Sequence, residues 1–320
     1  MILMNSPCNR VKCLGKQIWT TVLPAMRHIA SRELHNVSEN PATVKLAYVS
    51  YESMADTAEE NSTAPIMIMH GLFGSKNNWN SLAKVIHQKT NRKVIAIDAR
   101  NHGDSPHSSE VSYAVMAEDV IHLLKDLCID KAILIGHSMG GSTMMYVALF
   151  HPEVVEKLVV VDMSPIGTSP EIASMKKIFE SMRSITLDGN LSLTKARKMT
   201  DEQLSNSISS LTLRQFLLTN LVEAETGKYK WRVNLPALEQ HFEAQIARFP
   251  DVGPRSFNGP TLFIGGSNSD YIKVKDHPAI KRLFPEARFH YIAGASHWLH
   301  AEKPAEFLNI LTSFINQTDR

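Results

Sequence analysis

The sequence predicts an α/β fold in which a mostly parallel, doubly wound sheet carries helices on both faces. Short apolar runs recur along the chain, and turn residues follow each of them. Helical patterns of apolar residues lie between these runs, and this alternation is typical of doubly wound sheets. Because the apolar runs do not alternate with polar residues, they indicate strands that are buried on both faces.

These patterns define the expected elements in chain order. Strands are expected at 44–51, 66–69, 94–97, 132–135, 158–161, 261–264 and 288–292. Helices are expected at 79–88, 113–127, 139–150 and 304–315. Ser112 is a candidate N-cap for the second helix, and Pro304 suits the first turn of the last one.

The alternation stops between about 165 and 254, where the sequence favours charged helical segments and contains no convincing strand. We therefore expect a helical cap, 165–254, inserted between a first part of the core, 36–164, and a second part, 255–320. Apolar side chains of this cap are candidates either for lining an acyl pocket or for packing the cap itself. They are Met175, Ile178, Phe179, Met182, Phe216 and Leu217.

Composition limits the class of function. Hydrophobic residues make up 43% of the chain and charged residues 21%, which is typical of a soluble globular protein. The formal net charge of +2 gives no global reason to expect nucleic acid as a partner. No run reaches the roughly 18 consecutive apolar residues that a membrane span needs, so we expect no transmembrane segment.

The first 35 residues have the composition of a targeting segment. Residues 1–32 carry five basic residues and no acidic one, together with hydroxyl-bearing and apolar side chains. This pattern favours a mitochondrial transit peptide over a disordered basic tail or a secretory signal. Cys8 and Cys13 fall in this segment and leave Cys128 as the one cysteine of the remaining sequence, which agrees with a reducing compartment.

The strongest functional signal is the G-x-S-x-G motif of residues 136–140, with Ser138 at its centre. It follows an expected strand and opens an expected helix, which is the context of a nucleophile elbow. The serine of such an elbow sits in a strained turn that exposes its hydroxyl, and only small residues fit two positions before and after it. The motif predicts that Ser138 is the nucleophile of a serine hydrolase with the α/β-hydrolase fold.

A serine nucleophile needs a general base and two donors for the oxyanion. His297 follows the last expected strand, where this fold places the base, and His300 is its nearby competitor. One oxyanion donor is expected to be the backbone N–H of Met139, the residue after the nucleophile. The other is expected from the loop after the first central strand, at the N–H of Leu72, with Phe73 as the alternative.

Two aspartates compete for the third place in the triad. Asp162 ends the strand that follows the elbow, whereas Asp270 lies in a Gly/Ser/Asn loop several residues beyond its strand. Both come at carboxyl ends of strands, where open α/β sheets build their sites. We favour Asp162, because a carboxylate that abuts a buried strand is held rigidly enough to orient an imidazole.

Eight stretches of the chain resemble the abhydrolase-domain-containing protein 11 family of serine esterases and lipases, together with its bacterial esterase relatives. The resemblance covers roughly 45–315, including the insertion. It implies a mitochondrial serine esterase or lipase with acylglycerols such as diacylglycerol as substrates, and it maps the triad acid onto Asp162. The matching stretches read HGLFGSKNNW, DARNHGDSPHS, GHSMGG, VDMSP, LLTNLVE with KWRVNL, GPTLFIGG and GASHWLHAEKP.

The residues and the resemblance together predict hydrolysis of a lipid-like carboxylic ester through an acyl-enzyme on Ser138. We expect no metal and no cofactor, because the sequence contains neither H-E-x-x-H nor a Cys/His ligand spacing. The expected partner is a small-molecule ester, and no protein partner is predicted. A thioesterase or an amidase with the same triad is an alternative, as is a non-catalytic binding protein of this fold.

Overall fold

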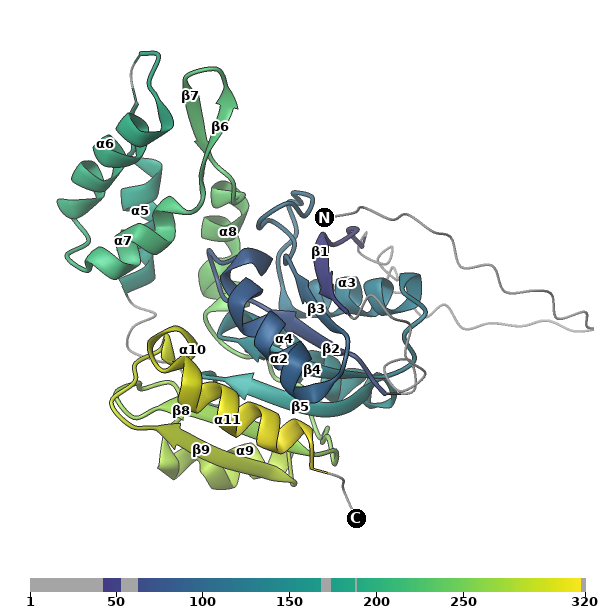
Figure 1. The fold of residues 1–320 in the computed structure, drawn as a ribbon. Helices are drawn as coiled ribbons and strands as arrows, with labels where there is room; N and C mark the ends of the chain where they lie inside the picture. The colour runs from purple at the N-terminus through teal and green to yellow at the C-terminus, as the bar shows by residue number, and fades with distance from the viewer. Residues whose placement is uncertain (1–42, 53–62, 168–173, 188, 318–320) are drawn as a thin grey trace, which may run out of the picture. The chain divides into compact units, whose positions relative to one another are not determined.

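The computed structural model describes residues 43–52, 63–167, 174–187 and 189–317. Their arrangement is shown in Figure 1. The expected targeting segment, 1–35, lies outside the described residues, so its prediction is not tested by the fold.

A seven-stranded sheet forms the centre of the described chain, in the spatial order β1-β3-β2-β4-β5-β8-β9. The edge strand β1 runs antiparallel to β3, and the other neighbouring strands are parallel. The predicted mostly parallel α/β sheet is therefore confirmed. The strands are β1 (Tyr48–Tyr51), β2 (Ile66–Met69), β3 (Val94–Ile97), β4 (Ala132–His137), β5 (Val155–Val161), β8 (Thr261–Gly266) and β9 (Ala287–Ile292).

Helices cover both faces of this sheet. On one face lie α2 (Asn80–Thr90) and α11 (Pro304–Ile315), and on the other lie α3 (Tyr113–Asp126), α4 (Met139–Phe150) and α9 (His277–Leu283). Ser112 Oγ accepts a hydrogen bond from the Val115 amide, as its expected N-cap role requires. Short helical turns complete this part of the fold: η1 (Lys76–Trp79), η2 (Pro152–Val154), η5 (Val274–Asp276) and α10 (Leu299–Glu302).

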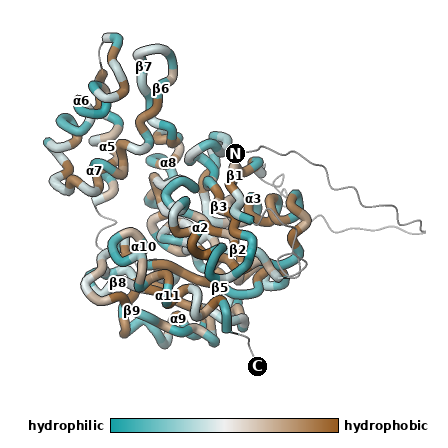
Figure 2. The backbone as a smooth tube through the Cα atoms, in the orientation of Figure 1, coloured by the Kyte–Doolittle hydropathy of each residue, from teal (hydrophilic) through white to brown (hydrophobic). Residues whose placement is uncertain are grey.

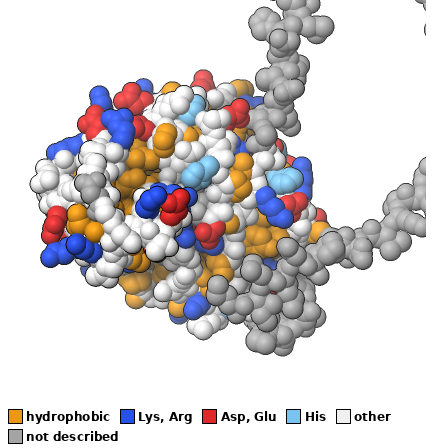
Figure 3. All heavy atoms as spheres, turned by 90° about the horizontal axis from the view of Figure 1, so that it is seen from above, with side chains coloured by type: hydrophobic (Ala, Val, Ile, Leu, Met, Phe, Trp, Pro, Cys, Tyr) orange, Lys and Arg blue, Asp and Glu red, His pale blue; other side chains and the backbone are white. Residues whose placement is uncertain are grey.

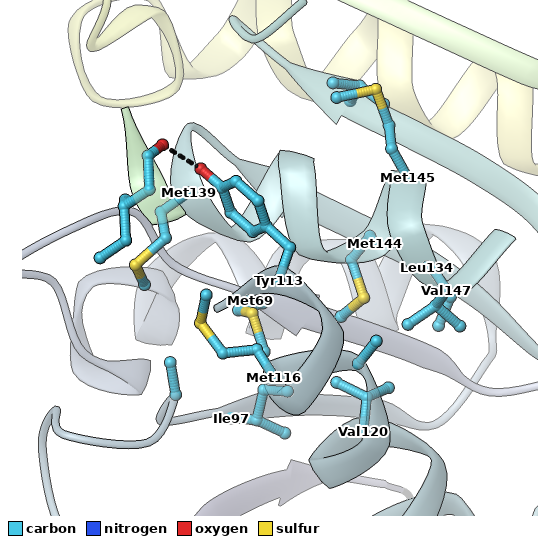
Figure 4. Close-up of a cluster of buried hydrophobic side chains, with 14 of the residues drawn as sticks. Met69, Ile97, Tyr113, Met116, Val120, Leu134, Met139, Met144, Met145 and Val147 are labelled. Carbon is cyan, nitrogen blue, oxygen red and sulfur yellow. Dashed lines mark hydrogen bonds between the residues drawn. The ribbon is translucent and has the colours of Figure 1, made fainter. Parts of the chain in front are cut away.

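Successive strand residues supply two separate apolar layers, because side chains alternate between the faces of a sheet. In β2, Ile66 and Ile68 pack beneath α2 and α11, whereas Met67 and Met69 pack beneath α3 and α4. Both layers are apolar, so β5 ends in the uninterrupted apolar run Leu158–Val161, and most of this strand is coloured as hydrophobic in Figure 2. Figure 4 shows the methionine-rich second layer, where the Tyr113 hydroxyl is hydrogen-bonded to the carbonyl of Ile246.

The insertion contains helices and, contrary to expectation, a β-hairpin. Its strands are β6 (Leu221–Glu225) and β7 (Lys228–Trp231), joined by a turn at Thr226 and Gly227. Most hairpin residues are half-buried or exposed, so they form none of the apolar runs that mark the central strands. The helical elements are α5 (Met175–Arg183), α6 (Leu193–Ser205), α7 (Leu211–Leu218), α8 (Leu235–His241) and the π-helical turn η4 (Phe242–Ile246).

Two asparagines, the buried Asn220 and the half-buried Asn234, join the insertion to loops of the core. Asn220, just before the hairpin, donates from Nδ2 to the carbonyl of Phe73 at 2.7 Å. Asn234, just after it, donates from Nδ2 to Oδ1 of Asn101 at 3.0 Å. Hydrogen bonds at both ends of the hairpin therefore fix this insertion against the loops that follow β2 and β3.

His300 is a buried histidine of α10 that packs against η1. Its ring stacks on Trp79, with ring centroids 4.7 Å apart. Burial, with a smaller contribution from the nearby His297, lowers the pKa of His300 to about 3. The ring is therefore neutral in the folded protein at any pH well above that value.

This burial predicts a pH-dependent stability. The pKa of His300 is lower in the folded chain than in the unfolded chain, so its contribution to stability is lost as pH falls from roughly 6.5 toward 3. His300→Phe keeps a stacked ring and should reduce the slope of unfolding free energy against pH by about 1.4 kcal/mol per pH unit in this window. Urea unfolding at several pH values measures the slope. His290→Phe, at an exposed position, is the matched control, and an unchanged slope in His300→Phe would contradict the expectation.

Candidate active site

Ser138 lies at a sharp turn between β4 and α4, with φ 54° and ψ −119°. Such a backbone conformation is costly for a residue with a side chain. A Cβ on Gly136 would lie 2.2 Å from the carbonyl oxygen of Gly140, and one on Gly140 would lie 2.5 Å from that of Met69. Both positions flanking Ser138 therefore require glycine, as the expected elbow geometry demands.

Asp162 and His297 are brought together at the carboxyl ends of β5 and β9. Nδ1 of His297 donates to Oδ2 of Asp162 at 2.7 Å. The fully buried carboxylate also accepts from the Gly266 amide at 3.1 Å and from Ser269 Oγ at 2.5 Å. These three donors compensate the buried charge and leave Nε2 of His297 as the nitrogen with a lone pair.

Asp270 is placed differently from Asp162. It is exposed and lines a smaller neighbouring cavity, not the cavity that contains Ser138 and His297. Its loop still contributes to the site, because Ser269 bonds the Asp162 carboxylate. Sequence reasoning weighed the two aspartates and missed Ser269, whose Gly/Ser/Asn context indicates only a turn.

Two further aromatic residues contact the His297 ring and were not expected from the sequence. Tyr271 stacks on it, with centroids 4.0 Å apart and the planes inclined by 17°. His137 donates from Nε2 to the His297 carbonyl at 2.9 Å, and burial lowers the pKa of His137 well below its usual range, so it is neutral. His297 is therefore held through its ring, its Nδ1 and its backbone carbonyl.

The loop after β2 presents both amides that the sequence nominates for the oxyanion hole. The Phe73 amide donates to Nε2 of His102 at 3.2 Å, whereas the Leu72 amide has no hydrogen-bond partner among the described residues. Met139 begins α4, where amides have no acceptor within the helix. Leu72 and Met139 thus retain N–H groups for a ligand, and Phe73 does not.

Two buried, neutral histidines, His70 and His102, form hydrogen bonds that hold the loop after β2. His70 donates from Nδ1 to the Gly71 carbonyl at 2.7 Å and accepts from the Ala99 amide at 3.1 Å. Burial lowers the pKa of His70, and it lowers the pKa of His102 to about 3. Each ring therefore keeps one nitrogen as an acceptor for a backbone amide, which fixes the loop that carries Leu72.

Ser138, His297, Leu72 and Met139 line one cavity of about 430 Å³, which is shared with the insertion. Met175, Ile178 and Phe216 of the insertion also line it. Phe179, Met182 and Leu217 do not line it and are buried in the apolar core. The Phe179 ring contacts Phe242 of the insertion and also Phe73 of the loop after β2. Figure 3 shows apolar side chains grouped on one face of the molecule among charged side chains of both signs.

The described residues contain neither a membrane-spanning helix nor a metal-binding cluster. No helix in this part of the chain has both the length and the hydrophobicity needed to cross a membrane. No group of three or more His, Cys, Asp or Glu side chains is arranged there to hold a metal ion.

Comparison with known proteins identifies relatives over most of the chain. Residues 64–304 match the family model described as alpha/beta hydrolase fold. The sn-1-specific diacylglycerol lipase ABHD11 of Mus musculus is 46% identical over 256 residues, which cover 80% of this chain and 82% of that protein. Esterase YbfF of Escherichia coli is 33% identical, over 82% of this chain and 97% of that one.

A solved structure agrees with these sequence relatives. The structure titled "Marine microorganism esterase" is 36% identical, with a TM-score of 0.77, and the match covers 85% of this chain and all of that one. The fold, the family model and the relatives therefore concur. The chain belongs to the α/β-hydrolase fold family, and it is an enzyme of the esterase and lipase type.

Proposed function

We propose that this enzyme hydrolyses carboxylic esters of lipid-like substrates, acylglycerols such as diacylglycerol among them, through Ser138, His297 and Asp162. The observation that carries the proposal is the 2.7 Å bond from His297 to the buried Asp162, in a cavity that also contains Ser138 at its strained turn. The apolar insertion residues around that cavity suit an acyl chain. The name of the mouse relative supports diacylglycerol as one such substrate.

In the proposed mechanism, Nε2 of His297 takes the proton of Ser138 Oγ as the oxygen attacks the acyl carbonyl. The amides of Leu72 and Met139 stabilise the oxyanion, and Asp162 stabilises the imidazolium. His297 then gives its proton to the leaving alkoxide, which departs as the alcohol. Water, deprotonated by His297, attacks the acyl-enzyme, and the proton returns to Ser138 as the carboxylic acid leaves.

The same steps would also cleave a thioester or an amide, so the triad alone does not define which bond is cleaved. Relatives named as lipase and esterase support an oxygen ester. We further propose that 165–254 acts as a cap between core parts 36–164 and 255–320. Met175, Ile178 and Phe216 would contact the acyl chain from this cap.

Ser138→Ala should abolish ester hydrolysis without unfolding the protein, because it deletes one small hydroxyl. We expect kcat for p-nitrophenyl esters to fall by about 10⁶, with an unchanged thermal midpoint. Ser313→Ala, on the exposed side of α11, is the matched control and should behave as the wild type. Turnover by Ser138→Ala within about tenfold of the wild type would contradict the nucleophile assignment.

Asp162→Asn should leave His297 without the carboxylate that orients its ring and stabilises its imidazolium form. We therefore expect kcat to fall by up to about 10⁴. Asp270→Asn makes the same chemical change at an exposed position and should cost far less. Both variants are compared by kcat on one ester, after circular dichroism shows that they are folded. Near-normal turnover in Asp162→Asn beside an inactive Asp270→Asn would reverse the assignment.

We also propose that residues 1–35 direct import into mitochondria, because residues 1–32 carry five basic residues and no acidic one. A fusion of this segment to a fluorescent reporter should colocalise with a mitochondrial dye. The matched control replaces those five Lys and Arg residues by Gln and should remain in the cytosol. A cytosolic wild-type fusion would refute the targeting role.

A further inference from the structure

Tyr271 covers one face of the His297 imidazole. The two ring centroids are 4.0 Å apart and the ring planes are inclined by only 17°, so the rings lie nearly parallel. Other aromatic rings near His297 are placed differently, since the plane of His137 is inclined by 40° and that of Trp298 by 73°. Among the described residues, Tyr271 is therefore the one whose aromatic face lies flat against this imidazole.

A single serine of the loop after β8 connects Tyr271 to the proposed triad acid. Ser269 Oγ donates to Oδ2 of Asp162 and accepts a hydrogen bond from the Tyr271 amide at 3.4 Å. The same carboxylate oxygen accepts from Nδ1 of His297 at 2.7 Å. One turn of the chain therefore holds Asp162 at the edge of the imidazole and Tyr271 against its face.

Other titratable groups lie around His297. His137 of β4 and His300 of α10 are buried, and burial lowers the pKa of each, so both rings are neutral. Glu302 of α10 and Asp270 of the loop after β8 are exposed, so solvent screens their charges. A positive charge on the imidazole is therefore compensated mainly by the residues that contact the ring directly.

The stack matters for the reaction because the proposed base becomes charged. In the proposed mechanism, His297 becomes an imidazolium as it takes the proton of Ser138. The face of an aromatic ring carries negative charge density, and a cation within about 6 Å of its centroid is attracted to it. Tyr271 therefore attracts the imidazolium of the transition state more strongly than the neutral imidazole of the resting enzyme. Such a difference lowers the barrier to reaction.

We propose that Tyr271 is a positioning residue that orients the His297 ring and stabilises its charged form through its aromatic face. The inference rests on the proposed function, since it takes His297 as the general base. It adds a second source of stabilisation, at the face of the imidazole, to the Asp162 carboxylate at its edge.

The first test removes the aromatic face. Tyr271→Phe keeps the face and should retain kcat within about threefold of the wild type. Tyr271→Leu should lower kcat by about five- to thirtyfold, with little change in KM. Because the protonated imidazole also loses stabilisation, the midpoint of the acid limb of kcat/KM against pH should move down by about one pH unit. An equal loss of kcat in the two variants would overturn the proposal, since only Tyr271→Leu lacks the face.

Ring-fluorinated phenylalanines at position 271 separate the charge of the face from its shape. One, two or three fluorines withdraw electrons from the face and change the size of the ring little. Each added fluorine should lower kcat and move the acid-limb midpoint further down, equally for the acetyl and hexanoyl esters of p-nitrophenol. A constant kcat and midpoint along the series would overturn the proposal, because a ring that only fills space gives that result. A loss confined to one ester would overturn it too, because that ring would be contacting the acyl chain.

Tyr146→Leu is the matched control. Tyr146 of α4 stacks on Phe150 with ring centroids 4.1 Å apart and planes inclined by 8°, so the substitution removes a comparable stack that does not involve His297. Its kcat and its acid-limb midpoint should equal those of the wild type. Changes as large as those of Tyr271→Leu would show that lost packing alone explains both variants, and would overturn the proposal.

His297→Gln separates this proposal from the proposed function. We expect this variant to lose turnover of p-nitrophenyl acetate. Retained turnover would mean that His297 is not the base and that the proposed function is wrong, whatever the variants at position 271 show. Loss of turnover in His297→Gln, combined with a constant fluorine series, would overturn the role of Tyr271 alone.

Discussion

The turn at Ser138 requires the end of β4 and the start of α4 to pack backbone against backbone, and the neighbouring geometry follows from that contact. Gly140 approaches the carbonyl of Met69 so closely that no side chain is tolerated there. Met69 ends β2, and the next residues form the loop that carries Leu72. One close approach therefore sets both the position of Ser138 and the position of the loop that carries the Leu72 amide.

The buried carboxylate of Asp162 depends on the same sheet edge. Its residue adopts φ 49°, and its amide bonds the carbonyl of Ile264 in the next strand. Gly266 ends β8 and Ser269 lies in the loop that follows it, so two donors to the carboxylate come from the neighbouring strand and its loop. A buried charge with several donors costs far less than an isolated one. The carboxylate of Asp162 is therefore held rigidly beside the His297 imidazole.

Local sequence patterns predicted the central strands and the turn at Ser138. The central strands appear in the sequence as uninterrupted apolar runs, and the flanking glycines of Ser138 report a steric requirement that acts over only a few residues. The hairpin β6–β7 escaped prediction because its strands are largely exposed and charged, so pairing rather than burial defines them. Ser269, Tyr271 and His137 escaped because their roles depend on contacts with residues 107, 26 and 160 positions away. No local pattern encodes such distances.

The hydrogen bond from Asn220 to the Phe73 carbonyl joins the insertion to the loop that carries the Leu72 amide. If the insertion lifts away, either this bond breaks and leaves a buried carbonyl unpaired, or the loop moves with it. Opening the site to solvent and keeping the anion-stabilising amide in place are thus opposed. Under the proposed mechanism, in which the Leu72 amide stabilises an oxyanion, attack would take place while this bond is intact, because the amide then keeps its position and water is more excluded. Substrate entry past the insertion and the catalytic step would then need different positions of the same loop.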